Sequence, residues 1–235
     1  MKNSLFTCFI ALLSTPLFAS YTNESELGIL VAKGNSNSES YSAKETVSKI
    51  WKDQNSLKFS GRYLQTKTSD IENARYWMTG LRYDYLLSSQ LSLFLGELLE
   101  SDKYAGYNQK YNTDIGAKYA IIKEPKFTLS SELGYRYTIE NQMTGTQNKL
   151  HYIRAYTEAT KTLSEGLSAK LWFEYLPNFT VGSDYQMNSE FSISASLNNI
   201  FSLKTGYLLR YDNLPNLGIM AKTDSLLTTS LVAKF

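Results

Sequence analysis

Long segments in which apolar and polar residues alternate dominate this sequence, and they limit the chain to a small group of folds. The clearest segment is 127–139, where odd-numbered positions are mostly apolar and even-numbered ones mostly polar. Residues 167–175, 185–197 and 201–211 follow the same pattern. Because successive side chains of a strand point to opposite faces, this alternation predicts β-strands with one apolar and one polar face.

Eight weaker segments of the same kind fill the rest of the chain and raise the number of predicted strands to twelve. Two of them, 40–51 and 91–101, do not keep one alternation throughout, which indicates a β-bulge or an error in the predicted register. The eight segments are 25–33, 40–51, 56–66, 74–87, 91–101, 110–122, 149–162 and 223–235.

The connections between these segments alternate in length, as is typical of an outer-membrane barrel with short turns at one end and longer loops at the other. The short connections are 52–55, 88–90, 123–126, 164–166 and 198–199. The longer, polar ones are 34–39, 67–73, 101–109, 140–148, 177–184 and 212–222.

Strand length and the chemistry of the polar face favour a membrane barrel over a soluble β-sandwich. The segments are about 9 to 14 residues long, whereas soluble strands average about 5 to 6 and a tilted spanning strand needs roughly 9 to 11. The polar face carries serine, threonine, lysine, glutamate and arginine, which would be costly in a dry core. We therefore predict an all-β fold, a single antiparallel transmembrane β-barrel of about twelve strands, with ten or fourteen as alternatives.

Aromatic residues lie near the ends of the apolar faces, where a membrane barrel carries its aromatic girdles. The alternative is that they are ordinary strand aromatics. Those expected at the outer rim are Tyr63, Trp77, Tyr137, Tyr175 and Tyr211, and those at the periplasmic rim are Phe127, Phe201 and Phe235. A last strand that ends in an aromatic residue, here Phe235, also resembles the signal recognised by the outer-membrane assembly machinery.

The N-terminus has the pattern of a cleavable secretory signal. Lys2 supplies a basic start, residues 5–13 are apolar, Pro16 breaks the run, and Ala19 is a small residue suited to the position before cleavage. The apolar run is shorter than the roughly 20 residues of a spanning helix. We expect residues 1–19 to be a signal peptide and 20–235 to be the barrel, located in the outer membrane.

Composition excludes several classes of function. The formal net charge is +2 with basic and acidic residues interspersed, whereas a nucleic-acid binder usually shows a clustered basic surface. Cleavage would remove Cys8, the only cysteine, so the exported chain could form no disulfide. With one histidine and no cysteine left, the usual zinc ligand sets are excluded. No cofactor motif occurs, and no metal site is predicted.

His151 is the only histidine, so a serine hydrolase acting at the rim would have to use it as its base. The sequence contains no Gly-X-Ser-X-Gly elbow. We expect a polar side chain at the start of a strand and predict no catalytic residue. Loop carboxylates such as Asp70 and Glu72, or Asp212 and Asp224, fit solvated loops or ion-bridged lipopolysaccharide better than a calcium site.

In a barrel, the polar faces of the strands line the lumen, and they carry many charges of both signs. These charges can pair across the lumen and plug it, or line a narrow aqueous channel, because charged side chains set pore selectivity. For most of them we favour a structural ion-pair network. The predicted lumen residues are Lys58, Arg62, Arg82, Asp84, Asp114, Lys118, Glu132, Arg136, Arg154, Glu158, Lys170, Glu174, Glu190, Lys204 and Arg210.

The first predicted hairpin carries a motif formed by Glu26, Leu27, Gly28, Gly34, Asn35 and Ser36. It resembles the salt-induced outer-membrane protein family, whose members open with a similar Glu-Leu-Gly…Gly-Asn-Ser hairpin. The resemblance implies an exported outer-membrane barrel and brings neither an established activity nor catalytic residues.

We predict a non-enzymatic protein, a small passive pore or a structural envelope component, with a link to osmotic or salt conditions implied by the resemblance. The alternatives are a lipid hydrolase acting at the outer rim and a receptor or adhesion module acting through the loops. The expected partners are outer-membrane lipid and lipopolysaccharide, periplasmic chaperones and the barrel-assembly machinery.

Overall fold

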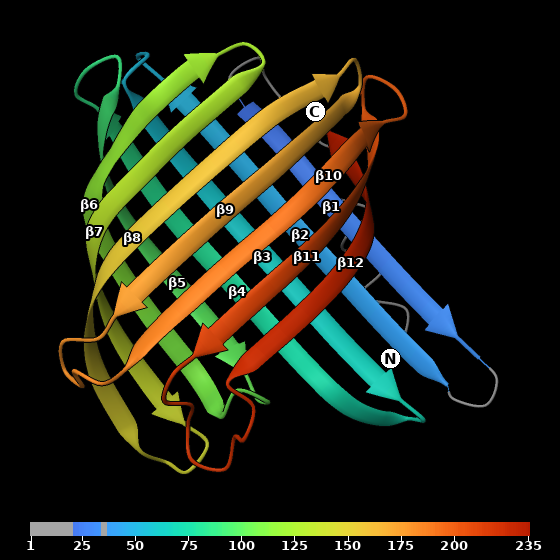
Figure 1. Cartoon of the computed structure of the whole chain (residues 1–235), viewed down its shortest axis with the longest axis vertical. Helices are drawn as coiled ribbons and strands as arrows, with labels where there is room; N and C mark the ends of the chain where they lie inside the picture. Colours follow the sequence, from blue (N-terminus) through green and yellow to red (C-terminus); the bar gives the residue numbers. More distant parts are fainter. Residues whose placement is uncertain (1–20, 34–36) are drawn as a thin grey trace.

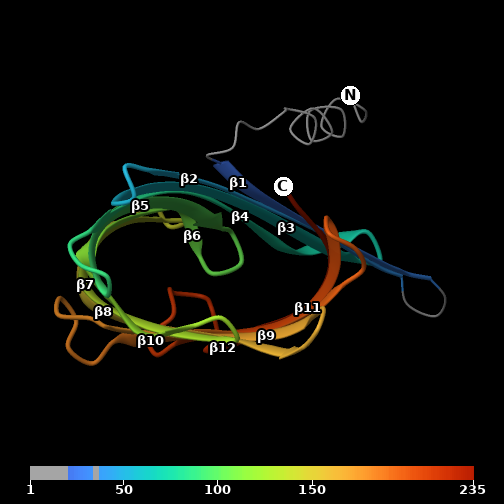
Figure 2. The same cartoon turned by 90° about the horizontal axis from the view of Figure 1, so that it is seen from above.

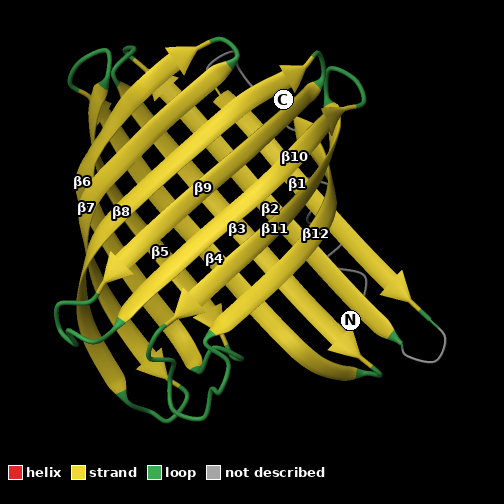
Figure 3. Ribbon diagram, in the orientation of Figure 1, coloured by secondary structure: helices red, strands yellow, loops and turns green. Residues whose placement is uncertain are grey.

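Every regular element in residues 21–33 and 37–235, which the computed structural model describes, is a β-strand (Figures 1 and 3). The predicted signal peptide, 1–19, and the motif residues Gly34, Asn35 and Ser36 lie outside these residues. No helix in the described part of the chain is long and apolar enough to span a membrane. The twelve strands are β1 (Tyr21–Ala32), β2 (Ser38–Trp51), β3 (Asn55–Thr68), β4 (Ile71–Leu86), β5 (Leu91–Asp102), β6 (Tyr107–Glu124), β7 (Phe127–Gln142), β8 (Gln147–Ser164), β9 (Leu167–Pro177), β10 (Tyr185–Ser196), β11 (Phe201–Asp212) and β12 (Thr223–Lys234).

Each strand pairs antiparallel with its neighbours in sequence, and β1 pairs with β12, so the sheet closes into a barrel. The view along the barrel in Figure 2 shows a flattened ring. The seam between β1 and β12 is paired from Glu24↔Lys234 to Leu27↔Leu231, next to the chain termini. Backbone hydrogen bonds between Asn23 and Phe235, at 3.0 and 2.9 Å, extend it. The predicted fold, a twelve-stranded antiparallel barrel, is confirmed.

The apolar faces of the strands point outward and the polar faces point into the lumen. Leu81, Ile115, Leu133 and Phe173 are exposed on the outside, at midbarrel positions. Acidic and basic side chains such as Glu132, which is 6% exposed, lie inside. This inversion of a soluble core is what strand alternation produces when lipid covers the outer face.

Aromatic side chains gather on the outer face near the loop end. The rings of Tyr175 and Tyr185 lie 6.0 Å apart between centroids, and those of Tyr185 and Tyr211 lie 5.7 Å apart. Tyr63 and Trp77 are register partners on β3 and β4. At the opposite end, the Phe201 and Phe235 side chains are exposed. These positions match the two girdles that the sequence predicts.

The loops are shorter than predicted, because the strand ladders continue through polar residues. The predicted loop 67–73 is wrong: β3 and β4 join through a two-residue turn, Ser69–Asp70, with φ of 51° and 65°. The connections 103–106 and 143–146 are also shorter than the predicted loops 101–109 and 140–148. Positive φ at both residues is what a tight hairpin with right-handed twist requires.

The irregular alternation of the two weak segments has different causes. β2 pairs with both neighbours without a register shift, so the bulge considered for 40–51 is absent. The pattern is broken there because Glu45 and Lys49 share the outer face with Tyr41 and Val47. In β5, the register with β6 does shift, between Glu100 and Asp102.

Two glycines face each other inside the barrel and make room for an aromatic ring. Gly116 on β6 and Gly134 on β7 are register partners. The Phe94 side chain, 3% exposed, lies over them. A Cβ on Gly116 would come within 2.5 Å of the Leu133 carbonyl oxygen and 2.7 Å of Phe94 Cζ. An aromatic ring packed over strand glycines is a known means of pinning register.

We expect Gly116→Ala to lower the free energy of unfolding by about 1–3 kcal/mol, because the added methyl group meets backbone atoms that cannot yield. The matched control is Gly61→Ala on β3, where the nearest atom to the new Cβ, the Met78 carbonyl oxygen, is 3.9 Å away. Urea unfolding in detergent micelles measures both. Equal stability of the two variants would contradict the packing described here.

Candidate functional site: the barrel lumen

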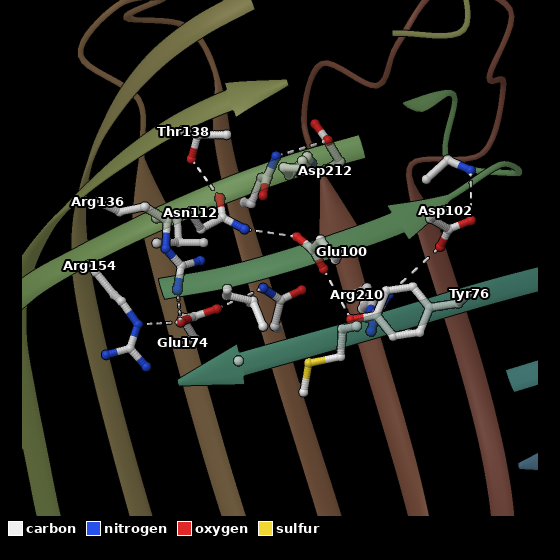
Figure 4. Close-up of a pocket in the computed structure, with 18 of the residues that line it drawn as sticks. Tyr76, Glu100, Asp102, Asn112, Arg136, Thr138, Arg154, Glu174, Arg210 and Asp212 are labelled. Carbon is white, nitrogen blue, oxygen red and sulfur yellow. Dashed lines mark hydrogen bonds and ion pairs between the residues drawn. The ribbon is translucent and has the colours of Figure 1, made fainter. Parts of the chain in front are cut away.

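The barrel encloses a cavity of about 400 Å³ that reaches the loop end. Its wall combines charged side chains with apolar and aromatic ones, among them Tyr76, Leu98 and Leu208. A second pocket of about 20 Å³ lies beside it, lined by residues of β1–β3 and β10–β12, among them Glu26, Lys44, Arg62 and Glu190. Figure 4 shows side chains from strands on both sides of the lumen converging on the main cavity.

Seven of the predicted lumen charges form one connected set of ion pairs, the central network. Arg154 is its hub: its Nε lies 2.6 Å from Glu174 Oε1 and its Nη1 lies 2.6 Å from Glu132 Oε2. Arg82 binds the same Glu132, at 2.9 Å. The members are Arg82, Asp84, Asp114, Glu132, Arg136, Arg154 and Glu174.

The rest of the central network extends from Arg136 and Arg82. Arg136 Nε lies 2.6 Å from Asp114 Oδ1, and its Nη2 lies 3.4 Å from Glu174 Oε1. The guanidinium of Arg82 reaches Asp84 at 2.7 Å and stacks on the Phe94 ring at 4.1 Å. Each buried charge therefore has a partner of opposite sign, the condition under which charges in a restricted space are tolerated.

A second group of ion pairs, the side network, joins β1, β2, β10 and β11. Lys204 Nζ lies 3.1 Å from Glu26 Oε2 and 3.4 Å from Glu190 Oε1. Lys44 Nζ lies 2.8 Å from Glu26 Oε1. The sequence prediction missed Lys44 and Glu26. The polar run Ser42, Lys44, Thr46 and Ser48 was the available signal, but Glu45 and Lys49 on the opposite face obscured it.

The remaining predicted charges differ in their partners. Lys170 pairs with Glu158 at 2.7 Å, and these side chains are 43% and 30% exposed. Arg210 approaches Asp102 at 3.8 Å and lies over the Tyr76 ring at 4.4 Å. Within the described residues, the remaining three have no ion pair or side-chain hydrogen bond: Lys58, Arg62 and Lys118.

Polar residues near the loop end complete the cavity wall, and sequence analysis missed them. Glu100 Oε2 accepts a hydrogen bond from the Tyr76 hydroxyl at 3.0 Å, and its Oε1 accepts one from Asn112 Nδ2 at 3.0 Å (Figure 4). Lys110 pairs with Glu140 at 2.9 Å. Glu140 fell in a predicted loop, and Lys110 and Glu100 lay at the ends of their predicted strands, where the inward face could not be assigned.

The β11–β12 loop, residues 213–222, turns inward over the mouth of the barrel (Figure 2). Its Asn216 accepts a hydrogen bond from Gln142 Nε2 at 2.5 Å and donates one to the Ala105 carbonyl at 3.2 Å. Pro215, Asn216 and Ile219 line the cavity. The loop is therefore tied to the β5–β6 connection across the opening and narrows it.

His151 lies on the outer face and has no catalytic arrangement in the described residues. Its Nδ1 is hydrogen-bonded to the Tyr135 hydroxyl, and its backbone N–H donates to Thr180 Oγ1 at 3.0 Å. Its ring packs against Tyr137 at 5.1 Å. No carboxylate contacts the ring in these interactions. Among the described residues, no group of three or more metal-binding side chains comes together either.

A closed twelve-stranded antiparallel barrel with an apolar outer face and a charged lumen defines the class of the fold, and solved structures of outer-membrane channels share it. The "COG4313 outer membrane channel from Pseudomonas putida F1" has a TM-score of 0.57 at 11% identity, covering 94% of this chain and 97% of that one. The "NanC porin" has a TM-score of 0.52 at 8% identity, covering 91% and 97%.

The chain belongs to the family described as "Protein of unknown function, DUF481", whose model matches residues 25–235. The match includes the first hairpin, which carried the family resemblance seen in the sequence. Nothing in the comparisons bears on induction by salt. No curated protein matches the chain.

We expect Glu132→Gln to lower the free energy of unfolding by about 3 kcal/mol, because Arg82 and Arg154 each lose a buried partner. The Glu132 side chain is 4% exposed. Lys170→Gln, which breaks the exposed pair with Glu158, should change it by less than about 1 kcal/mol. Urea titration followed by tryptophan fluorescence measures both. Similar losses in the two variants would show that the central network does not stabilise the barrel.

Proposed function

We propose that this protein is a narrow passive channel for small polar solutes in a bacterial-type outer membrane. The observation that carries the proposal is the 400 Å³ cavity inside a closed barrel, lined by charged and polar side chains while apolar ones face outward. Similarity of fold to outer-membrane channels supports the membrane location. An apolar belt around a polar lumen is how such barrels carry water-filled paths.

The lumen has three parts along its length. The loop-end cavity opens beside the inward β11–β12 loop, and the central network with Phe94 crosses the middle. Beyond it, Lys170 and Glu158 are partly exposed near the turn end. A solute that enters from the loop end would pass the inward loop first and then the central network, so we infer that these two features limit the conductance.

Several sequence predictions become part of this proposal. The chain would be exported through the signal peptide 1–19 and assembled through the Phe235 signal by periplasmic chaperones and the assembly machinery. It would lie among outer-membrane lipid and lipopolysaccharide, where its loops, two to ten residues long in the described connections, offer little surface for a large partner. A link to osmotic conditions remains a prediction.

The structural-component alternative draws on one specific observation, the connected central network. Three arginines and four carboxylates share it, and each of these seven has an ion-pair partner at 3.4 Å or less. Such a set can act as a plug that stiffens the barrel. A protein that is folded and inserted in a planar bilayer but gives no current steps would favour this alternative.

Replacing residues 214–221 by two glycines should raise the single-channel conductance in a planar bilayer, because it removes the loop that narrows the mouth. The matched control changes Ser69–Asp70 to Asn-Gly, a turn that keeps the tight hairpin geometry and does not line the cavity. Its conductance should equal that of the unchanged protein. Discrete steps that are no larger in the loop variant would overturn the assignment of the loop as a constriction.

A further inference from the structure

The lumen is unevenly paired: within the described residues, three of the predicted lumen charges have no ion pair, and all three are basic. Two of them, Lys58 and Arg62, lie together on β3, whereas Lys118 lies on β6 and does not line the cavity. Lys58 and Arg62 both face the cavity from β3, with Ser60 between them on the same face. Within the described residues, neither forms an ion pair or a side-chain hydrogen bond. Arg62 is half-buried and Lys58 is exposed to the lumen. Both cations are therefore surrounded by protein yet accessible to a solute.

Arg210 adds a third positive charge beside this strand. Arg62 and Arg210 line the same cavity. Arg62 also lines the small second pocket together with Glu26 and Glu190, both of which pair with Lys204. The guanidinium of Arg210 lies over the Tyr76 ring, and its carboxylate partner Asp102 is 3.8 Å away. Two like charges that face one cavity repel each other unless an anion lies between them.

The acids of the cavity are largely engaged with other donors, and Asp102 approaches Arg210 only at 3.8 Å. Glu100 accepts hydrogen bonds from Tyr76 and Asn112. Asp102 accepts two from the backbone N–H groups of Tyr104 and Ala105, at 3.0 and 3.1 Å. The Asp114 and Glu174 carboxylates belong to the central network.

We propose that Arg62, with Lys58 and Arg210, binds the anionic group of a small solute, a carboxylate, sulfate or phosphate, on its way through the lumen. A guanidinium presents paired donors that match the oxygens of such a group. Leu98 and Leu208 on the cavity wall offer contact to a short organic body. The inference rests on the proposed channel and names its solute class.

The selectivity experiment measures the reversal potential of single channels in a gradient of KCl at low ionic strength, where surface charges are least screened. We expect a preference for chloride and partial block by inorganic phosphate. Arg62→Gln and Lys58→Gln should each reduce the preference, and Arg62→Gln should weaken phosphate block roughly tenfold or more, because charge-assisted hydrogen bonds are lost. Arg62→Lys should keep most of the preference.

Lys170→Gln is the matched control, since it also removes one lumen cation but one that is paired and lies outside the cavity. It should leave phosphate block unchanged. Discrete current steps with no chloride preference, and with phosphate block that does not depend on Arg62, would overturn the anion site while leaving the channel intact.

A second measurement separates failure of the site from failure of the channel. Isothermal titration calorimetry of the folded protein in detergent with inorganic phosphate requires no conductance. Phosphate binding that Arg62→Gln abolishes would support the site even if the bilayer stays silent, in which case the channel proposal alone fails. Absence of binding to the unchanged protein, together with a silent bilayer, would overturn both.

Discussion

Backbone hydrogen bonding is the constraint on which the rest of this structure depends. In lipid, N–H and C=O groups have no water to pair with, so a sheet can span the membrane only if it closes. Here β1 and β12 close the sheet. They are paired from Glu24↔Lys234 to Leu27↔Leu231, and two backbone hydrogen bonds between Asn23 and Phe235 extend the pairing. The C-terminal residue thus takes part in closing the barrel, in addition to its predicted part in assembly.

Closure fixes what each face of a strand must carry. One side of every strand meets lipid, so the polar side meets the polar sides of all other strands across a confined space. Charges collected there must find partners, and the central network is that outcome for Arg82, Arg136 and Arg154. Where side chains would collide, glycine takes their place. The Gly116–Gly134 pair and the Phe94 ring over it lie beside Arg82 of the central network.

Alternation predicted the strands, the fold and the inward orientation of the fifteen candidate residues, because period two is a local property of the chain. Loop lengths were predicted less well. Polar residues such as Lys67 and Glu72 have loop-like composition, yet they are register partners that continue the ladder, since pairing with a neighbouring strand decides where a strand ends. Lys44 was missed because outward-facing charges on β2 hid the alternation of its inner face. Contacts across the lumen, such as Asn216 with Ala105, depend on how strands distant in sequence meet and leave no local signal.

The uneven distribution of ion pairs among the lumen charges bears on whether the lumen is plugged or open to a solute. A lumen built only to be filled would gain from pairing every charge, since an unpaired charge in a confined space is unfavourable. Arg82, Arg136 and Arg154 meet this expectation. Lys58 and Arg62 on β3, and Lys118 on β6, do not, because they have no ion-pair partner in the described residues. Water in the cavity tolerates such charges, and a passing anion makes use of them. A narrow, selective channel requires both features. Ion pairs in the central network hold the barrel rigid, and cations without an ion pair on β3 face the solute.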